Sequence, residues 1–149
     1  MLELDSTDRL RMTIRSVAVW LLIVVCEILH GIVRSIVLVP LVGQFRSNQL
    51  GVFTGSAIIL AIAYFTIRWL RATRTLDLLL VGGIWLVLTA SFELLFGRLV
   101  MGLSWPRIWS DYNLFDGGLM PLGLLFLFFS PLLAAKWRAK RSRINAPPL

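Results

Sequence analysis

Four long apolar runs, separated by short polar segments, make up most of the chain. A helix needs about 20 apolar residues to cross a hydrocarbon core of roughly 30 Å, and each run is close to that length. The pattern predicts an all-α integral membrane protein, a four-helix transmembrane bundle in a single domain covering residues 1–149. We expect the helices at residues 17–39, 50–70, 77–101 and 118–135.

Local signals place the ends of the first two helices. Pro40 lacks a backbone N–H and clashes with the preceding turn, so we expect the first helix to end there, with Gly43 following. Asn48 is a suitable N-cap for the second helix. Gly51 and Gly55, four residues apart, predict a close approach of another helix. The first run is too long for the core of a signal peptide, so we expect it to be retained.

Charge sets the expected orientation. The 149 residues carry a net charge of +7, and 58% of them are hydrophobic, against about 45–50% in soluble domains. Basic residues gather at the ends of the apolar runs, which is typical of loops facing an anionic leaflet and does not favour nucleic-acid binding. We expect a protein of a cell membrane, bacterial inner or plasma membrane, with both termini cytoplasmic and bound to anionic headgroups. Three groups of basic residues stand on the expected cytoplasmic side, against Arg46 and Arg107 on the other: Arg9, Arg11, Arg15; Arg68, Arg71, Arg74; Lys136, Arg138, Lys140, Arg141, Arg143.

The two halves of the chain resemble one another when one is shifted by 66 residues. Residues 17–72 would then correspond to residues 83–139 as two parallel helical hairpins, related by a pseudo-two-fold axis along the membrane normal. Three residue types that are uncommon within apolar helices coincide at this offset: Glu27 with Glu93, Gly31 with Gly97, and Pro40 with Pro106.

Charged residues inside the apolar runs are the candidate site. An ionised side chain at the bilayer centre costs several kcal/mol, so it must be paired, hydrated or protonated. Glu27, His30 and Arg34 have a spacing that puts them on one helix face. The third helix supplies Glu93 and Arg98. One interpretation is a buried ion-pair network in which Glu27 binds Arg34 or Arg98 and Glu93 binds the other arginine.

Two function classes follow from this set of residues. The first, which we expect, is a structural or accessory subunit of a larger membrane complex, held by the buried Glu/His/Arg network. The alternative is a small proton-coupled transporter or channel that uses Glu27 and Glu93, and we would expect it to act as a homodimer because four helices enclose little space. Burial and a second nearby carboxyl group both favour the protonated form, so protonation of such a pair can be coupled to movement of a cation or a basic substrate.

Other chemistry is less well supported. Glu27, His30 and Glu93 have suitable metal-ligand types, but the neighbouring arginines compete for the carboxylates, so we expect no metal. His30 is the only histidine, which excludes bis-histidine haem within one chain, and we expect no cofactor. No Ser/His/Asp set, nucleotide loop or CxxC motif is present, so we do not expect an enzyme, although a lipid-modifying enzyme can use a Glu–His pair.

The loop of residues 102–118 is rich in aromatic residues. Aromatic side chains with a polar edge favour the headgroup level, so we expect this loop to lie along the membrane surface. The alternative is a lid or a docking surface for a partner. The candidate residues are Trp105, Trp109, Asp111, Tyr112 and Asn113.

Overall fold

The structure is a computed structural model, which describes residues 6–144. Helices make up nearly all of this part of the chain, and it contains no strand. Four helices are long and apolar enough to cross a membrane, which confirms the predicted number of apolar helices of that length. In chain order the elements are α1 (Ser6–Val42), α2 (Gln44–Leu70), α3 (Thr75–Leu95), the π-helix η1 (Phe96–Val100), α4 (Trp105–Tyr112), the 3-10 helix η2 (Leu114–Asp116) and α5 (Met120–Ile144).

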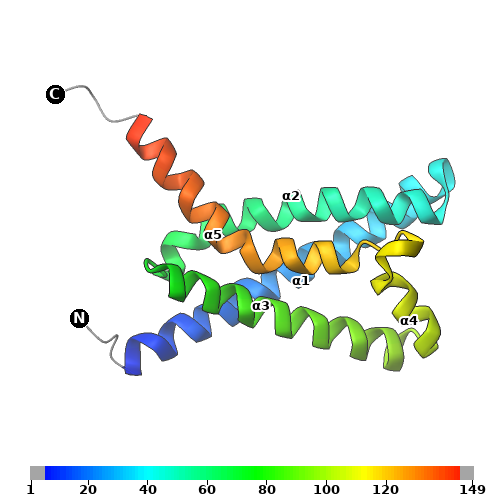
Figure 1. Cartoon of the computed structure of the whole chain (residues 1–149), viewed down its shortest axis with the longest axis horizontal. Coiled ribbons are helices and arrows are strands. Elements are labelled where there is room, and N and C mark those ends of the chain that lie inside the picture. The colour runs from blue at the N-terminus through cyan, green and yellow to red at the C-terminus, as the bar shows by residue number, and fades with distance from the viewer. Residues whose placement is uncertain (1–5, 145–149) are drawn as a thin grey trace.

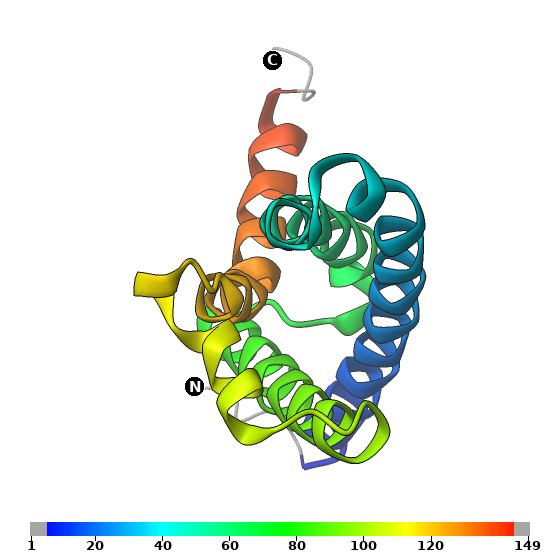
Figure 2. The same ribbon diagram turned by 90° about the vertical axis from the view of Figure 1, so that its right-hand side faces the viewer.

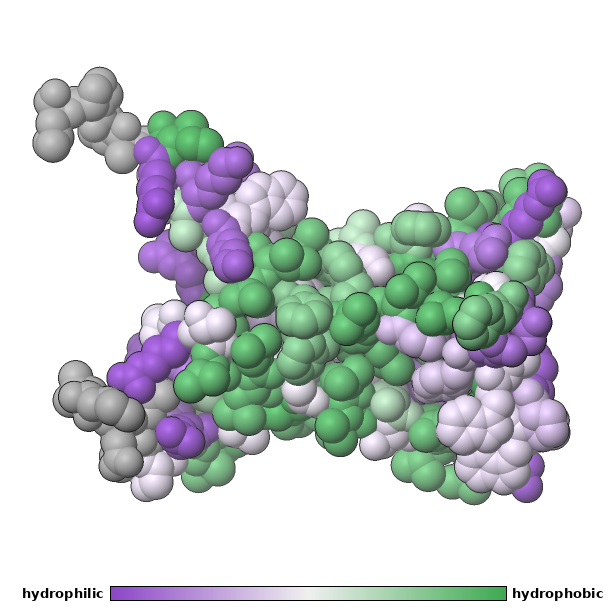
Figure 3. Space-filling model, in the orientation of Figure 1, coloured by the Kyte–Doolittle hydropathy of each residue, from purple (hydrophilic) through white to green (hydrophobic). Residues whose placement is uncertain are grey.

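The four long helices form an antiparallel bundle (Figure 1). Around the bundle, α1 packs on α2, α2 on α5, α5 on α3, and α3 on α1. One end of the bundle, which we call the terminal end, carries the start of α1, the end of α5 and the turn between α2 and α3. The other end, the α4 end, carries α4 and the turn between α1 and α2. Apolar side chains cover the middle of the molecule and hydrophilic ones gather at both ends (Figure 3).

The buried core lies in the half of the bundle next to the terminal end. Val19 of α1, Ala63 of α2, Trp85 of α3 and Leu127 of α5 pack there with almost no exposed surface. Among the described residues, the buried polar side chains of this half are Ser16 and Ser130. The bundle is therefore closed at its terminal end by close-packed apolar side chains.

Two tryptophans join α1 to α3 in the same half. The Trp20 indole donates to Thr89 Oγ1 at 3.0 Å, and the Trp85 indole donates to the Ser16 carbonyl oxygen at 2.9 Å. Beyond these two bonds α1 and α3 diverge towards the α4 end (Figures 1 and 2). Gly31, further along α1, has no heavy atom within 4 Å of the position that a Cβ would occupy. The two helices therefore form a wedge that is closed at one end.

Arginine side chains bind helix carbonyl groups at the terminal end. Arg15 of α1 donates to the Trp69 carbonyl oxygen of α2 at 3.0 Å, with its guanidinium 5.5 Å from the Trp69 ring centre. Arg138 of α5 donates to the Tyr64 carbonyl oxygen at 2.8 Å. Trp69 lies in the last turn of α2, where carbonyl groups lack helical partners and cations are stabilising. Tyr64 lies further inside α2, which ends at Leu70, so α1 is bound to the end of α2 and α5 to an earlier turn.

Three of the four predicted boundaries of the first two helices were wrong, and the end of α2 at Leu70 agrees. Helix α1 begins at Ser6 and continues through Pro40 to Val42. Pro40 removes one backbone N–H, but the next turn still bonds to the helix, since the Gly43 N–H donates to the Val39 carbonyl oxygen at 3.0 Å. The break is Gly43, whose φ of 80° lets the chain reverse within one residue. Helix α2 therefore begins at Gln44, and Asn48 lies inside it rather than capping it.

The second half of the chain departs from its predicted boundaries in smaller ways. The third helix begins at Thr75 and its last turn, η1, is widened to a π-helix. The fourth helix covers Met120–Ile144 instead of residues 118–135, because the lysines and arginines of its last turns are good helix formers. Pro131 lies inside α5, which changes direction along its length (Figure 1).

Gly82 marks the closest contact between α3 and α5 and gives a test of the packing. A Cβ at Gly82 would lie 1.9 Å from the Phe128 carbonyl oxygen, which is fixed backbone. We expect Gly82→Ala to lower the free energy of unfolding by about 1–3 kcal/mol or more, since overpacking forces the backbone to shift. Denaturant unfolding in detergent micelles, followed by tryptophan fluorescence, measures this change.

The adjacent glycine is the matched control. A Cβ at Gly83 would lie 3.9 Å from the nearest atom of Phe128, an ordinary contact. Gly83→Ala should leave stability unchanged or raise it by up to about 1 kcal/mol through helix propensity. Equal effects of the two substitutions would contradict the α3–α5 contact described here.

Candidate functional site

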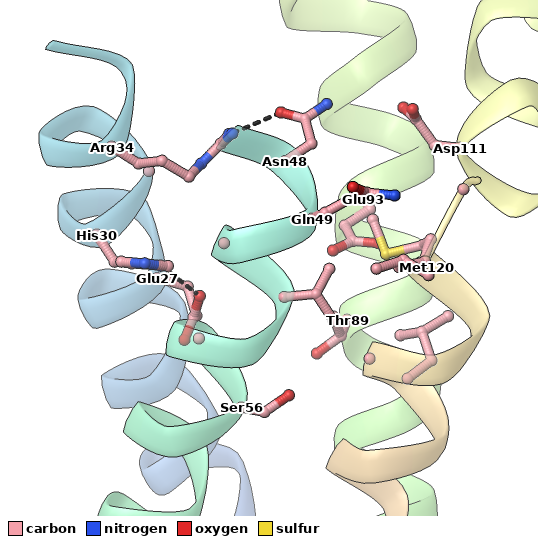
Figure 4. A pocket seen from close by; sticks show the side chains of 18 of the residues that line it. Glu27, His30, Arg34, Asn48, Gln49, Ser56, Thr89, Glu93, Asp111 and Met120 are labelled. Carbon is pink, nitrogen blue, oxygen red and sulfur yellow. Dashed lines mark hydrogen bonds and ion pairs between the residues drawn. The ribbon is translucent and has the colours of Figure 1, made fainter. Parts of the chain in front are cut away.

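A cavity of about 780 Å³ lies between the four long helices. It reaches from α4 and the α1–α2 turn to Ile23, Ile59 and Leu127, where the buried core begins. Glu27, His30 and Arg34 line the α1 side, and Glu93 and Thr89 line the α3 side (Figure 4). The divergence of α1 from α3 thus produces a polar space where the sequence pattern predicted polar side chains.

Glu27 and His30 form the predicted contact on α1. His30 Nδ1 lies 3.3 Å from Glu27 Oε2, and His30 Nε2 lies 2.7 Å from the Thr54 hydroxyl of α2. An ionised carboxylate can only accept, so Nδ1 carries the hydrogen when Glu27 is ionised. The Thr54 hydroxyl, which also lies 3.0 Å from the Leu50 carbonyl oxygen, bonds to Nε2 on the other side of the ring. The imidazole therefore links the carboxyl group of α1 to α2. The other carboxyl oxygen, Glu27 Oε1, is buried and has no hydrogen-bond partner among the described residues.

Two glycines of α2 make room for the charged side chains of α1. A Cβ at Gly55 would lie 2.8 Å from Glu27 Oε2, and one at Gly51 would lie 2.7 Å from Arg34 Cδ. The sequence predicted that these glycines let a neighbouring helix approach closely. Helix α1 does pack on α2, but the space over the glycines holds side chains of α1 rather than its backbone.

The predicted arginine–glutamate pairs do not form among the described residues. Arg34 donates to Ser47 Oγ at 3.3 Å and to Asn48 Oδ1 at 2.5 Å, both on α2. Arg98 donates to the Leu103 carbonyl oxygen at 3.1 Å, and its guanidinium lies 5.7 Å from the Trp105 ring centre. The reason is geometric: Arg34 extends towards the start of α2, and Arg98 lies in the π-helical turn η1, next to the loop that follows it.

Glu93 is the most isolated charged side chain of the cavity. Its Oε2 is buried and has no hydrogen-bond partner in the described part of the chain. In Figure 4 it lies near Gln49 of α2 and Met120 of α5, across the cavity from His30. The two glutamates therefore face one space, each with an unsatisfied oxygen atom. Glu27, His30 and Glu93 do not converge on one point, and residues 6–144 contain no group of three metal-ligating side chains.

The aromatic loop folds over the α4 end. Asp111 lines the cavity and lies 3.0 Å from Arg107 Nη1. Asn113 caps η2 by accepting from the Phe115 N–H at 3.1 Å. The Trp109 and Tyr112 rings pack edge to face with centres 5.8 Å apart. Trp105 and Trp109 are about half exposed on the outside of the molecule. Of the five predicted loop residues, only Asp111 lines the main cavity.

Several residues around the site were not predicted from the sequence. Asn48, Gly51 and Gly55 line the cavity from one face of α2 at helical spacing, and Thr54 beside them bonds to His30. A face of small and polar residues inside an apolar run is the signal that would have found them. Phe92 and Phe96 of the α3 wall carry no such signal, because phenylalanine is common in apolar helices.

Comparison with known proteins gives no relative from which a function could be carried over. No protein-family model matches the chain, and no curated protein or solved structure matches it. The function must therefore be argued from the geometry of the cavity.

Tyr112 reports on the charges at the α4 end. Burial raises the pKa of its phenol, and the nearby negative charges of Glu93 and Asp111 raise it further, because both effects oppose the phenolate. In a Tyr64→Phe background, which leaves Tyr112 as the only tyrosine, we expect the midpoint of tyrosinate absorbance above 10.0, the ordinary pKa. Adding Glu93→Gln should lower this midpoint. Asp77→Asn, at the terminal end, should not change it, and a midpoint of 10.0 or less in the background variant would contradict the arrangement.

Proposed function

We propose that this protein is a small proton-coupled transporter of cations, in which Glu27 and Glu93 bind either protons or the transported cation. A single observation carries the proposal: both glutamates face one cavity of about 780 Å³, and each has a buried oxygen atom without a partner among the described residues. A buried structural network would instead have its charges paired.

The two carboxyl groups favour exchange of a proton for a cation. Inside an apolar bundle a carboxyl group is either protonated or neutralised by a positive charge. A cation that enters the cavity therefore competes with the proton for the same oxygen atoms. Release of the proton on one side and its return on the other would couple the two movements in opposite directions.

The closed terminal half supports transport by alternating access. The apolar core around Trp85 and Leu127 separates the cavity from the terminal end, so a solute reaches the glutamates from the α4 end. Transport then requires α1 and α3 to move relative to one another, with the wedge closing at the α4 end as it opens at the other. A channel would need a continuous path, which the buried core does not provide in this conformation.

An internal repeat would suit such a movement. We propose that α1–α2 and α3–α5 are equivalent hairpins, as residues 17–72 and 83–139 suggest. The packing order α1–α2–α5–α3 sets the proposed equivalents side by side, α1 against α3 and α2 against α5, and not on opposite sides of an axis along the bundle. The two hairpins differ in chemistry, since Phe96 stands at the position of His30 and Val100 at that of Arg34.

The proposed orientation places the terminal end in the cytoplasm. The basic residues of the flanks gather at that end, where they can bind anionic headgroups. The exposed tryptophans of α4 would then lie at the opposite interface, and the cavity would open away from the cytoplasm. A homodimer or a larger complex would enlarge the space between the helices or stabilise a bundle of this size.

Proteoliposomes with an acidic interior and an entrapped pH dye test the proposal. Adding inorganic or organic cations outside should alkalinise the interior, as each entering cation displaces a proton. Glu27→Gln or Glu93→Gln should reduce the initial rate by more than about tenfold, because a neutral amide cannot exchange a proton for a cation. Asp8→Asn, which changes a carboxyl group in the first turn of α1, is the matched control and should retain the rate.

The same variants separate transport from the accessory-subunit function. If no cation changes the internal pH, and Glu27→Gln lowers the abundance of the protein and of copurifying partners, the transporter is wrong and a packing subunit is favoured. Normal abundance with lost flux supports the transporter.

A further inference from the structure

We propose that the cavity binds a hydrophobic organic monocation, such as a quaternary ammonium, between Glu93 and the aromatic pair Phe92–Phe96. This inference rests on the proposed transport function and names its class of substrate. One cavity contains a carboxylate, two aromatic rings and apolar side chains. A substitution can remove each of these contacts separately.

The aromatic pair is held firmly on the α3 wall. The Phe92 and Phe96 rings stack with centres 5.3 Å apart and an interplanar angle of 19°. Trp20 of α1 packs edge to face against Phe92, with centres 6.4 Å apart. Both phenylalanines line the cavity. Aromatic faces attract cations through the ring quadrupole, and they bind quaternary ammonium groups in particular because those groups are weakly hydrated.

Glu93 lies next to this pair in the helix. It follows Phe92 directly and precedes Phe96 by three residues, so the three side chains share one side of α3. Glu93 Oε2 has no hydrogen-bond partner in residues 6–144. A carboxylate beside two aromatic rings therefore offers an ammonium group both a counter-charge and a π face.

The other charges of the cavity do not oppose a cation. Arg107 is paired with Asp111 at 3.0 Å, and Arg34 donates to Ser47 and Asn48. Asp116 adds a further acidic group to the lining. The lining has four carboxyl groups against two arginines, so the ionised cavity has an excess of negative charge, which disfavours anionic solutes.

The size and the wall of the cavity favour an organic cation over an inorganic ion. A volume of about 780 Å³ is in the range of pockets for organic ligands. An inorganic cation requires several oxygen atoms around one point, whereas much of this wall is apolar. The apolar side chains come from all four long helices: Val24, Ile28, Val52, Ile59, Phe92 and Leu124.

A tetraalkylammonium series tests the substrate class. Equilibrium dialysis against the full chain in nanodiscs should show affinity rising more than about tenfold from tetramethylammonium to tetrapropylammonium, since each added methylene is buried against the apolar wall. Empty nanodiscs correct for partition into lipid. Glu93→Gln should weaken tetrapropylammonium binding by more than about tenfold.

Phenylalanine variants test the aromatic contact. Phe96→Leu keeps an apolar side chain but removes the π face, and should weaken tetrapropylammonium binding by about two- to tenfold. Phe53→Leu, on the outer surface of α2 with 70% of its surface exposed, is the matched control and should bind normally. The elution profile of each variant confirms that it is folded.

The results separate this inference from the transport function. Equal affinity across the series, or binding that is unchanged in Glu93→Gln and Phe96→Leu, overturns the substrate class. If the proteoliposomes still exchange protons for inorganic cations, transport stands and only the substrate class is lost. Tight binding that follows the expected pattern without any flux supports the binding site and overturns transport.

Discussion

A carboxyl group inside an apolar bundle costs several kcal/mol unless it is protonated, hydrated or paired with a positive charge. The structure meets this constraint by separating helices rather than by pairing charges. Helices α1 and α3 diverge beyond the tryptophan hydrogen bonds, and the space between them receives Glu27 and Glu93. Gly51 and Gly55 extend that space towards α2. The two glycines and the polar side chains of the cavity surround the place where the two carboxyl groups lie.

The two halves of the bundle consequently have different physical properties. The terminal half is closed by apolar side chains of all four long helices and by two arginines bound to carbonyl groups of α2. The α4 half holds a cavity with charged and apolar side chains in its wall, and a short helix and a turn cover it. A close-packed half resists deformation, whereas the side chains around a large cavity have fewer packed neighbours. The bundle is therefore close-packed at the α1–α3 crossing and open around the glutamates.

The sequence predicted the four long helices and the Glu27–His30 contact, because both depend only on hydrophobic length and on helical spacing along one element. It did not predict how charges on different helices would meet. Arg34 binds Asn48 and Ser47 instead of a glutamate because helix α2 starts earlier than expected and carries these residues within reach. Arg98 lies in a π-helical turn, which no residue pattern predicted. The wedge between α1 and α3 arises from the packing of whole helices. The cavity and its aromatic wall could therefore not be predicted from the residue pattern of any single helix.

The closed terminal half also has an electrical consequence. When water fills the cavity, it conducts ions, and a membrane voltage then falls mainly across the apolar layer around Trp85 and Leu127 rather than across the whole bilayer. A charge that crosses the full voltage changes its energy by about 2.3 kcal/mol per 100 mV. A proton that reaches Glu93 from the α4 end would cross little of that field, whereas its passage through the closed layer would cross most of it. In the transport cycle proposed above, the thickness of this layer, set by a few buried side chains, would determine which step responds to voltage.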